Sequence, residues 1–466
     1  MKAHKFLEKE GYKYYYVNKL NYFIKTDSTG SYLLQNKFNC IPRSKPTQSI
    51  DSKRLKQTEE ELSYVIKNNE CSSGKVRQNV IMKCGRGASL INDIRIVPTL
   101  ECNLGCHYCH QRKYVKNIQG RKMNREIAAQ VVNFICSKKI GPSLQIKFYG
   151  GEPFLNFPAI QYIVENLSSC IPGKNILQFS VTTNGLLMND TIIDFLIKHN
   201  FHTAVSLDGP AILHNKNRTY KNGRGTFNRV FKNIEQIKKI NYAYFKKNLS
   251  ILATLDSECV HDFKIATDFF AEIDLSNVMV NWIVKKDGLT SINNDILKDI
   301  TYNIINHNHR RVPFLNLMNK LDCMRLDKSN LNDMKIQPCG AGKVLLAISP
   351  SGDLYPCEQF LDRVTGKIGD IFNGLNTNIV MQMHCALNNK VLQCLDCWAI
   401  RFCPYNCFFV QLVSKYDYCD FIRKQTGDIM RMFVELAEND VDSYVELISY
   451  WHSRSEKINK YEYCVV

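Results

Sequence analysis

Between residues 93 and 284, apolar strand-like runs alternate with stretches of helical periodicity, and this alternation constrains the fold more than any other feature. Helical spacing is clear in Ile127, Val131 and Phe134, and Asn189 and Thr226 are predicted N-caps of two later helices. Six strand–helix repeats indicate a parallel sheet with right-handed crossovers, whose functional loops follow the carboxyl ends of the strands. The predicted strands are 94–99, 144–149, 177–182, 202–207, 249–255 and 277–284.

A cysteine array follows the first predicted strand. Cys102, Cys106 and Cys109 are spaced as C-x3-C-x2-C within the run E-C-N-L-G-C-H-Y-C-H. Their thiolates could converge on one soft metal site, and clustered cysteines hold iron–sulfur centres. Accident would produce only about 0.03 such arrays in this chain. Three ligands would leave the fourth iron corner open to a substrate or cofactor.

A second cysteine array lies toward the C-terminus. Its core has the spacing C-x2-C-x5-C-x3-C, which chance would yield about 0.001 times. A zinc ribbon is the first alternative, because C-x2-C pairs suit tetrahedral zinc. The cysteines concerned are Cys339, Cys357, Cys394, Cys397, Cys403, Cys407 and Cys419.

Composition narrows the class of protein. The N-terminus lacks the apolar segment of a signal peptide, and no apolar run has the 18 residues that a membrane span needs, so we expect a soluble, cytoplasmic protein. Nineteen cysteines, an odd number, favour metal sites and a reducing compartment over disulfides. Cys136 and Cys170 fall in or at the ends of predicted helices and are expected to fill core. The net charge of +17 favours an acidic peptide or a nucleic acid as partner.

The first array, with the aromatic Tyr108 before its third cysteine, resembles the signature of the radical S-adenosylmethionine (SAM) superfamily. The resemblance implies a [4Fe–4S] cluster whose open iron is chelated by SAM. Reductive cleavage of SAM would give a 5′-deoxyadenosyl radical that takes a hydrogen atom from the substrate. The cofactors would supply this chemistry, and the protein would supply orientation and exclusion of competing reactions.

Three more strand ends carry segments that resemble SAM-contact elements of this family. The G-G-E-P segment resembles the element that receives the SAM amino group, since glycines permit close approach and a carboxylate accepts from an ammonium. The segments after the next two strands would contact the ribose or the carboxylate of SAM, with turn chemistry as the alternative. These candidates are Gly150, Gly151, Glu152, Pro153, Thr183, Asn184 and Ser206.

The run V-S-L-D-G-P-A-I-L-H-N-K-N-R resembles the anaerobic sulfatase-maturase and peptide-maturase subgroup. The resemblance implies that Asp208 is an acid/base in the substrate pocket and that Arg218 reaches SAM. A turn-forming D-G pair and a solvated loop arginine are the alternatives for these two residues.

The second array resembles the SPASM extension of radical SAM maturases, which binds two auxiliary [4Fe–4S] clusters, so three clusters are expected in all. The resemblance assigns Cys394, Cys397, Cys403 and Cys419 to one auxiliary cluster. It assigns Cys339, Cys357 and Cys407 to the other, whose fourth ligand is Cys385 or an open position.

The expected fold class is α/β: a partial (β/α)6 TIM-barrel radical SAM core with a small N-terminal α+β domain and a C-terminal Cys-rich SPASM domain. The expected domains are 1–90, 91–330, 331–425 and a helical tail at 426–466. Residues 13–26 predict one or two strands. By position and composition, the first domain resembles the leader-binding domain of peptide maturases.

The expected function is modification of a ribosomally synthesised precursor peptide with a leader, forming thioether crosslinks between a cysteine sulfur and a carbon. Formylglycine formation, as in anaerobic sulfatase maturases, and carbon–carbon crosslinking are rivals. Radical modification of a nucleic acid and a non-catalytic electron carrier are alternatives from other classes. Expected partners are the peptide and a low-potential electron donor of the flavodoxin or ferredoxin type, with neither nucleic acid nor membrane.

Overall fold

The computed structural model describes a set of segments that includes residues of all six predicted strands of the central sheet. These are residues 3–9, 12–17, 22–26, 34, 53, 56–60, 63, 90–109, 122–138, 140–171, 177–273, 277–283, 293, 295–296, 299, 340–361, 366–394, 397–399 and 418–439.

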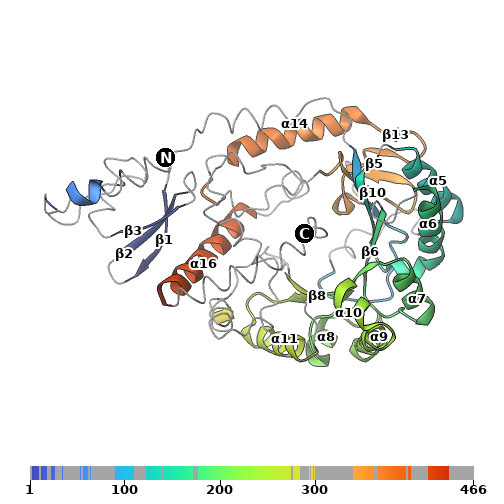
Figure 1. Cartoon of the computed structure of the whole chain (residues 1–466), viewed down its shortest axis with the longest axis horizontal. Helices are drawn as coiled ribbons and strands as arrows, with labels where there is room; N and C mark the ends of the chain where they lie inside the picture. The colour runs from blue at the N-terminus through green and yellow to red at the C-terminus, as the bar shows by residue number, and fades with distance from the viewer. Residues whose placement is uncertain are drawn as a thin grey trace.

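The elements follow one another as the alternation predicted (Figure 1). The N-terminal strands are β1 (Ala3–Lys9), β2 (Tyr12–Val17) and β3 (Tyr22–Thr26). The central strands are β4 (Ile91–Ile96), β5 (Ile140–Phe148), β6 (Leu177–Thr183), β7 (His202–Ser206), β8 (Leu249–Leu255) and β9 (Val278–Trp282). The helices among them are α5 (Arg125–Cys136), η2 (Pro153–Asn156), α6 (Phe157–Cys170), α7 (Asp190–Lys198), α8 (Ala211–Asn217), α9 (Phe227–Ile240), α10 (Tyr242–Asn248) and α11 (Val260–Glu272).

The C-terminal part contains short strands and two long helices. They are β10 (Leu345–Ile348), β11 (Asp353–Tyr355), η5 (Glu358–Phe360), β12 (Gly369–Asp370), β13 (Gly374–Leu375), α14 (Thr377–Cys394) and α16 (Tyr418–Asn439). No helix among the described segments combines the length and the apolarity that a membrane crossing requires.

The sheet confirms six consecutive parallel strands. Its order is β13-β12-β11-β10-β4-β5-β6-β7-β8-β9, and every pair from β4 to β9 is parallel. Each of the six predicted strands overlaps an observed one. The helices α5, α6 and α7 lie outside the strands (Figure 1). Because neighbouring strands run the same way, their carboxyl ends meet at one edge of the sheet.

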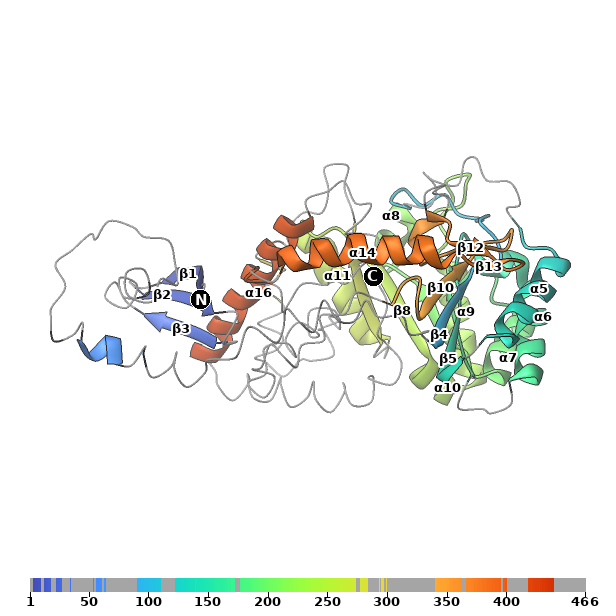
Figure 2. The ribbon, with the colours of Figure 1, turned by 90° about the horizontal axis from the view of Figure 1, so that it is seen from above.

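The sheet extends beyond the six predicted units through β10, which pairs in parallel with β4 at Leu345↔Asp93 and Ile348↔Ile96 (Figure 2). From β10 to β13, each strand is antiparallel to the next. Part of the expected 331–425 domain is therefore joined to the central sheet by backbone hydrogen bonds. Helix α16 continues through residue 425, where the sequence placed a boundary.

The N-terminal strands form a separate antiparallel sheet of order β1-β2-β3. The sequence predicted one or two strands between residues 13 and 26, where the structure has two, and missed β1, whose charged residues mask its alternation. The hydroxyl of Tyr14 donates to Glu438 Oε1 at 2.6 Å, so β2 contacts α16.

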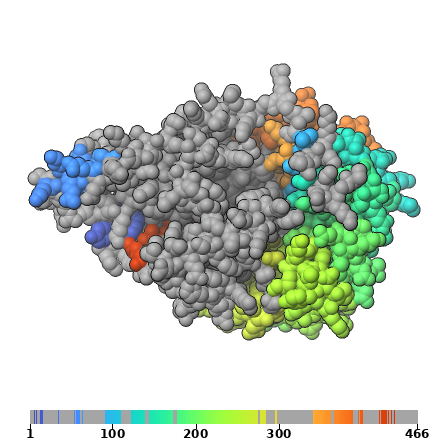
Figure 3. All heavy atoms as spheres, in the orientation of Figure 1, coloured from blue at the N-terminus to red at the C-terminus, as the bar shows by residue number. Residues whose placement is uncertain are grey.

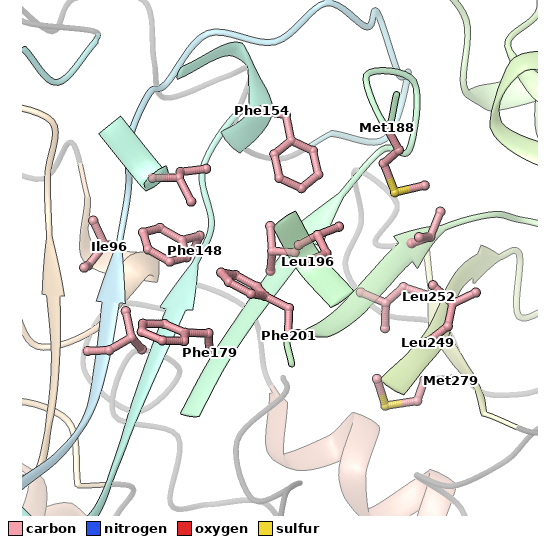
Figure 4. Packing of buried hydrophobic residues seen from close by; sticks show 14 of the residues in the cluster. Ile96, Phe148, Phe154, Phe179, Met188, Leu196, Phe201, Leu249, Leu252 and Met279 are labelled. Carbon is pink, nitrogen blue, oxygen red and sulfur yellow. The ribbon is translucent and has the colours of Figure 1, made fainter. Parts of the chain in front are cut away.

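The core lies between the sheet and its outer helices. In β6 and β7, alternate residues are buried, and the residues between them are only partly buried. Aromatic rings fill the space under α7, where the centroid of Phe201 lies 6.0 Å from Phe148, 5.3 Å from Phe179 and 5.8 Å from Phe195 (Figure 4). Phe201 is fully buried. This cluster fixes α7 against β5 and β6 and holds the strand ends in place.

Of the two predicted N-caps, the structure confirms the capping bond of one. The Asn189 side chain accepts from Ile192 N at 3.0 Å at the start of α7. Thr226 occupies the cap position of α9, but its side chain makes no capping bond. Its hydroxyl instead donates to the carbonyl of Arg218 at 2.7 Å.

The expectation that Cys136 and Cys170 fill core was wrong for Cys170, which is exposed, whereas Cys136 packs against the core. They lie at the C-terminal ends of α5 and α6, half-buried and exposed respectively, and are joined by a disulfide with a Cα–Cα distance of 6.4 Å. The packing of α5 against α6 brings the two helix ends together, which spacing in the sequence does not reveal.

Replacing Phe201 by alanine should leave a cavity among the three rings of Phe148, Phe179 and Phe195. We expect Phe201→Ala to lower the free energy of unfolding by about 3–5 kcal/mol, measured by anaerobic urea denaturation. Phe372 is 61% exposed, so Phe372→Ala should change it by less than about 0.5 kcal/mol. Equal losses in the two variants would contradict the assignment of this core.

Candidate active site

The first cysteine array occupies the loop after β4. Cys106 is buried, and Cys102 and Cys109 are half-buried; all three are free thiols. The loop pairs with the segment after α8: Gly105 N donates to Thr219 O at 2.8 Å, and His107 N donates to Asn217 O at 3.3 Å. The backbone of the array is therefore held by the residues on either side of Arg218.

The three thiols lie near one another without yet forming a ligand set. The pKa of Cys102 is raised to about 11, mainly by burial and to a smaller extent by the neighbouring Glu152, Cys106 and Cys109, against a backbone hydrogen bond from Leu104. As the side chains stand, no group of three or more Cys, His, Asp or Glu in the described segments has the spacing of a metal site. To hold a cluster, these thiols would have to release their protons.

The G-G-E-P segment packs directly on the backbone of the cysteine loop. Gly151 N donates to Thr99 O at 3.1 Å, and Glu152 N donates to Glu101 O at 2.8 Å. A Cβ on Gly151 would collide with the carbonyl of Glu101, and Gly150 has φ +137°. Only glycine fits this approach. Pro153 then opens the short helix η2.

Glu152 is fully buried, and its carboxylate joins the loops after β5 and β6. Its Oε1 accepts from Thr183 Oγ1 at 2.8 Å and from Phe154 N at 3.2 Å, and its Oε2 accepts from Asn184 N at 2.8 Å. Burial raises the pKa of Glu152 to about 7, and these neutral donors oppose the rise. A carboxylate has about four lone-pair sites, so room for one further donor remains.

Asn184 extends this network to the cysteine loop. Its Nδ2 donates to Asn103 Oδ1 at 2.8 Å and lies 3.8 Å from Cys102 Sγ. The structure thus brings the predicted residues Cys102, Glu152, Thr183 and Asn184 together. Ser206 lies at the end of β7 and is only partly buried.

Asp208 and Arg218 form a buried ion pair at the end of β7. Arg218 Nε donates to Asp208 Oδ2 at 3.0 Å, and the Tyr108 hydroxyl donates to the same oxygen at 2.7 Å. The Arg218 guanidinium carbon lies 5.3 Å from the centre of the Tyr108 ring. Asp208 Oδ1 accepts from Thr254 N at 2.8 Å. These contacts join the cysteine loop to the ends of β7 and β8.

Sequence reasoning missed His214, which is 1% exposed and lies beneath this ion pair. Asp208 N donates to His214 Nδ1 at 3.3 Å, and His214 Nε2 lies 3.0 Å from Thr226 Oγ1. Burial, together with the charge of Arg218, lowers the pKa of His214 to about 3. The only signal in the sequence is a histidine in the helix that follows the D-G turn.

The second array is described at four of its seven cysteines. Cys394 ends α14, Cys397 N donates to Cys394 O at 2.9 Å, and Cys419 is at the start of α16. Burial raises the pKa of Cys394, and the nearby Cys419 and Cys397 add to the rise. Three members of one predicted ligand set therefore lie near one another. The fourth described cysteine is Cys357, which is buried, and Cys339, Cys403 and Cys407 lie outside the described residues.

A comparison with protein families identifies the superfamily that the central part of the chain resembles. Residues 96–264 match the model of the radical SAM superfamily. The matched range contains the first array, the G-G-E-P segment and the Asp208–Arg218 pair. This family implies SAM and a [4Fe–4S] cluster. Three neighbouring thiols, a glycine cradle and a buried carboxylate with room for one donor fit that pair of groups.

Two curated relatives are similar to part of the chain. The radical SAM cyclopropyl synthase TigE of Paramaledivibacter caminithermalis is 26% identical over 206 residues, 41% of this chain and 42% of TigE. The cysteine-type anaerobic sulfatase-maturating enzyme of Clostridium perfringens is 24% identical over 279 residues, 56% of this chain and 72% of that enzyme. The match to TigE thus spans less than half of that relative.

Two solved structures share the fold. The anaerobic sulfatase-maturating enzyme anSMEcpe with bound AdoMet has a TM-score of 0.60 at 19% identity, covering 74% of this chain and 99% of that one. Streptococcus suis SuiB bound to the precursor peptide SuiA has a TM-score of 0.50 at 17% identity, covering 87% and 94%. Residues 96–264 are thus similar to the radical SAM superfamily, and the chain shares its fold with anSMEcpe and with SuiB.

The raised pKa of Glu152 predicts a specific pH dependence of stability. The folded protein binds the Glu152 proton more tightly than the unfolded chain, whose value is near 4.5, so this stabilisation is complete below pH 4.5 and is lost as pH rises through about 7. In Glu152→Gln the effect is absent. We expect the free energy of unfolding of wild type minus that of Glu152→Gln to fall by about 3 kcal/mol across this window.

The measurement is urea denaturation of the SAM-free protein at a series of pH values. Glu165 is exposed, and Glu165→Gln is the matched control, which should follow the wild-type curve. Parallel curves for wild type and Glu152→Gln would contradict the buried, proton-binding state of Glu152.

Proposed function

We propose that this chain modifies a ribosomally synthesised precursor peptide by joining a cysteine sulfur to a carbon, which closes a thioether. The observation that carries the proposal is the pairing of two cysteine sites in one chain. The first lies in the loop held by Glu152, Asn184 and the Asp208–Arg218 pair, and the second gathers Cys394, Cys397 and Cys419. One site suits radical formation, and the other suits uptake of an electron.

The proposed reaction balances with these two sites. Closing a thioether removes one hydrogen atom from the peptide carbon and one proton and one electron from the peptide thiol as the carbon–sulfur bond forms. When bound, the first cluster and SAM supply a 5′-deoxyadenosyl radical for the hydrogen atom, and an auxiliary cluster takes up the electron. A flavodoxin- or ferredoxin-type donor supplies the electron that cleaves SAM.

In the proposed assignment, the residues of the chain bind and orient these groups. Cys102, Cys106 and Cys109 hold the first cluster, and Glu152 accepts from the SAM amino group. Thr183, Asn184 and Ser206 are proposed to contact the ribose or carboxylate of SAM, and Arg218 is proposed to reach SAM. Gly150, Gly151 and Pro153 let the backbone approach.

The second array is proposed to hold two auxiliary [4Fe–4S] clusters. Cys394, Cys397, Cys403 and Cys419 would hold one, and Cys339, Cys357 and Cys407 the other. Cys385 is exposed on α14 in the described structure, which favours an open position over Cys385 as the fourth ligand. An open iron there could bind the substrate thiolate and place it beside the carbon.

The domain arrangement is part of the proposal. Strands β4 to β9 and their helices would form a partial (β/α)6 barrel within residues 91–330, and residues 331–425 would form the SPASM domain. The sheet β1–β3 within residues 1–90 would bind the leader. The likeness of the fold to anSMEcpe with bound AdoMet and Cp18Cys peptide, and to SuiB bound to the precursor peptide SuiA, supports a peptide substrate.

Formylglycine formation is the second candidate, favoured by the likeness of the fold to anSMEcpe. A nucleic-acid substrate is less well supported. The exposed Lys239 and Lys247 lie on α9 and α10, which precede the amino end of β8, opposite the strand ends that carry the site. These helices belong to the green to yellow-green surface in Figure 3.

The test is anaerobic co-expression with a Cys-containing peptide encoded beside the gene, followed by mass spectrometry. We expect a loss of two hydrogens per crosslink together with protection of one cysteine from alkylation. Carbon–carbon crosslinking would give the same mass but leave the thiol reactive, and formylglycine formed from cysteine would lose the sulfur. Either outcome would overturn the thioether assignment.

Two variants serve as controls. Cys106→Ala should abolish the modification, because it removes a ligand of the first cluster. Cys259→Ala, at a half-buried free cysteine of another loop, should leave the modification intact.

A further inference from the structure

The acid/base role that the resemblance implies for Asp208 does not match its surroundings. Both oxygens of its carboxylate already accept hydrogen bonds, Oδ2 from Tyr108 and Arg218 and Oδ1 from Thr254 N. The residue is 1% exposed. A general acid or base must come within hydrogen-bond reach of the proton that it transfers. Asp208 would have to give up a buried ion pair to do so, and breaking such a pair is strongly unfavourable.

We infer that Asp208 is a positioning residue, which locks the cysteine loop to Arg218 so that the cluster and SAM are held in a fixed relation. Tyr108 lies between Cys106 and Cys109 in the sequence, so the bond from its hydroxyl to Asp208 fixes the middle of the C-x2-C segment. Arg218 reaches the same oxygen from the other side. The inference rests on the radical SAM core and holds whichever peptide is the substrate.

A second layer of hydrogen bonds holds the backbone of both members of the ion pair. Because Asp208 N donates to His214 Nδ1, the proton of the neutral ring is on Nε2, which then donates to Thr226 Oγ1. The Thr226 hydroxyl donates in turn to the carbonyl of Arg218 at 2.7 Å. This chain, His214 to Thr226 to Arg218, explains why Thr226 does not cap α9.

The cysteine loop and the Arg218 segment are also joined directly. Gly105 N and His107 N donate to the carbonyls of Thr219 and Asn217, on either side of Arg218. Side-chain and backbone bonds therefore couple the same two segments. Loss of the Asp208 charge should release the loop from Arg218 while the backbone pairing keeps the fold.

The primary experiment measures SAM binding to the reconstituted holoenzyme without peptide. Asp208→Asn keeps the size of the side chain but places an amide donor beside Arg218 or Tyr108. We expect its Kd for SAM, from equilibrium dialysis, to rise tenfold or more. We also expect the change that SAM causes in the EPR spectrum of the reduced cluster to be weakened. Asp262→Asn, which removes the exterior ion pair with Lys216 at 2.8 Å, should leave both unchanged.

A milder variant tests the same contact if Asp208→Asn fails to fold. Tyr108→Phe removes only the hydroxyl bond to Asp208, and with full iron content it should weaken SAM binding about threefold to tenfold. The inference is overturned if Tyr108→Phe retains its iron and binds SAM as wild type does. It is also overturned if Asp208→Asn binds and cleaves SAM normally without peptide but no longer modifies the peptide, because that result assigns proton transfer to Asp208.

Failure of the proposed peptide chemistry would look different. In that case wild type and both variants would form 5′-deoxyadenosine without a thioether product, and the order of their SAM affinities would still test the positioning role.

Discussion

The site depends on one fully buried carboxylate that holds several strand-end loops together. Glu152 binds the loop after β6 through Thr183 and Asn184, and its backbone N–H binds the cysteine loop at Glu101. Because the strands are parallel and adjacent, their carboxyl ends are already near one another, but loops at these ends are otherwise free to vary. The carboxylate converts that proximity into a fixed geometry, and the two glycines before it remove the side chains that would keep the loops apart.

The buried ion pair of Asp208 and Arg218 likewise holds loops together, at the end of the neighbouring strand β7. Glu152 has neutral donors around it, whereas Asp208 has a guanidinium at 3.0 Å. Between them the two carboxylates contact both ends of the cysteine array, Glu152 through Asn184 near Cys102 and Asp208 through Tyr108 near Cys109. The cysteine loop is thus supported from the β6 side and from the β7 side.

The sequence predicted the features that depend on local pattern and failed where packing between distant elements decides. Alternation located all six parallel strands. Glu152 and Asn184 were predicted from the resemblance of their segments to SAM-contact elements, and the structure places the two residues in contact. The pairing of β10 with β4 was missed, because about 250 residues separate the two strands and neither carries a mark of its partner. The disulfide between Cys136 and Cys170 was missed because their meeting depends on how α5 packs on α6. His214 was missed because a histidine in a helix has no signature until its partners, Asp208 N and Thr226, are known.

The contrast between the two carboxylates also indicates where a cation belongs. Burial alone would make an ionised Glu152 costly, and the hydroxyl and two backbone N–H groups that surround it offset only part of that cost, which leaves its pKa at about 7. Asp208 meets the same burial with a permanent guanidinium. A positively charged group at the remaining lone pair of Glu152 would supply what Arg218 supplies to Asp208. In the proposed site the SAM amino group would bring that charge, so its binding and the ionisation of Glu152 would favour each other. A buried carboxylate without a neighbouring cation is costly. The site therefore favours a ligand that brings a cation to Glu152 over one that does not.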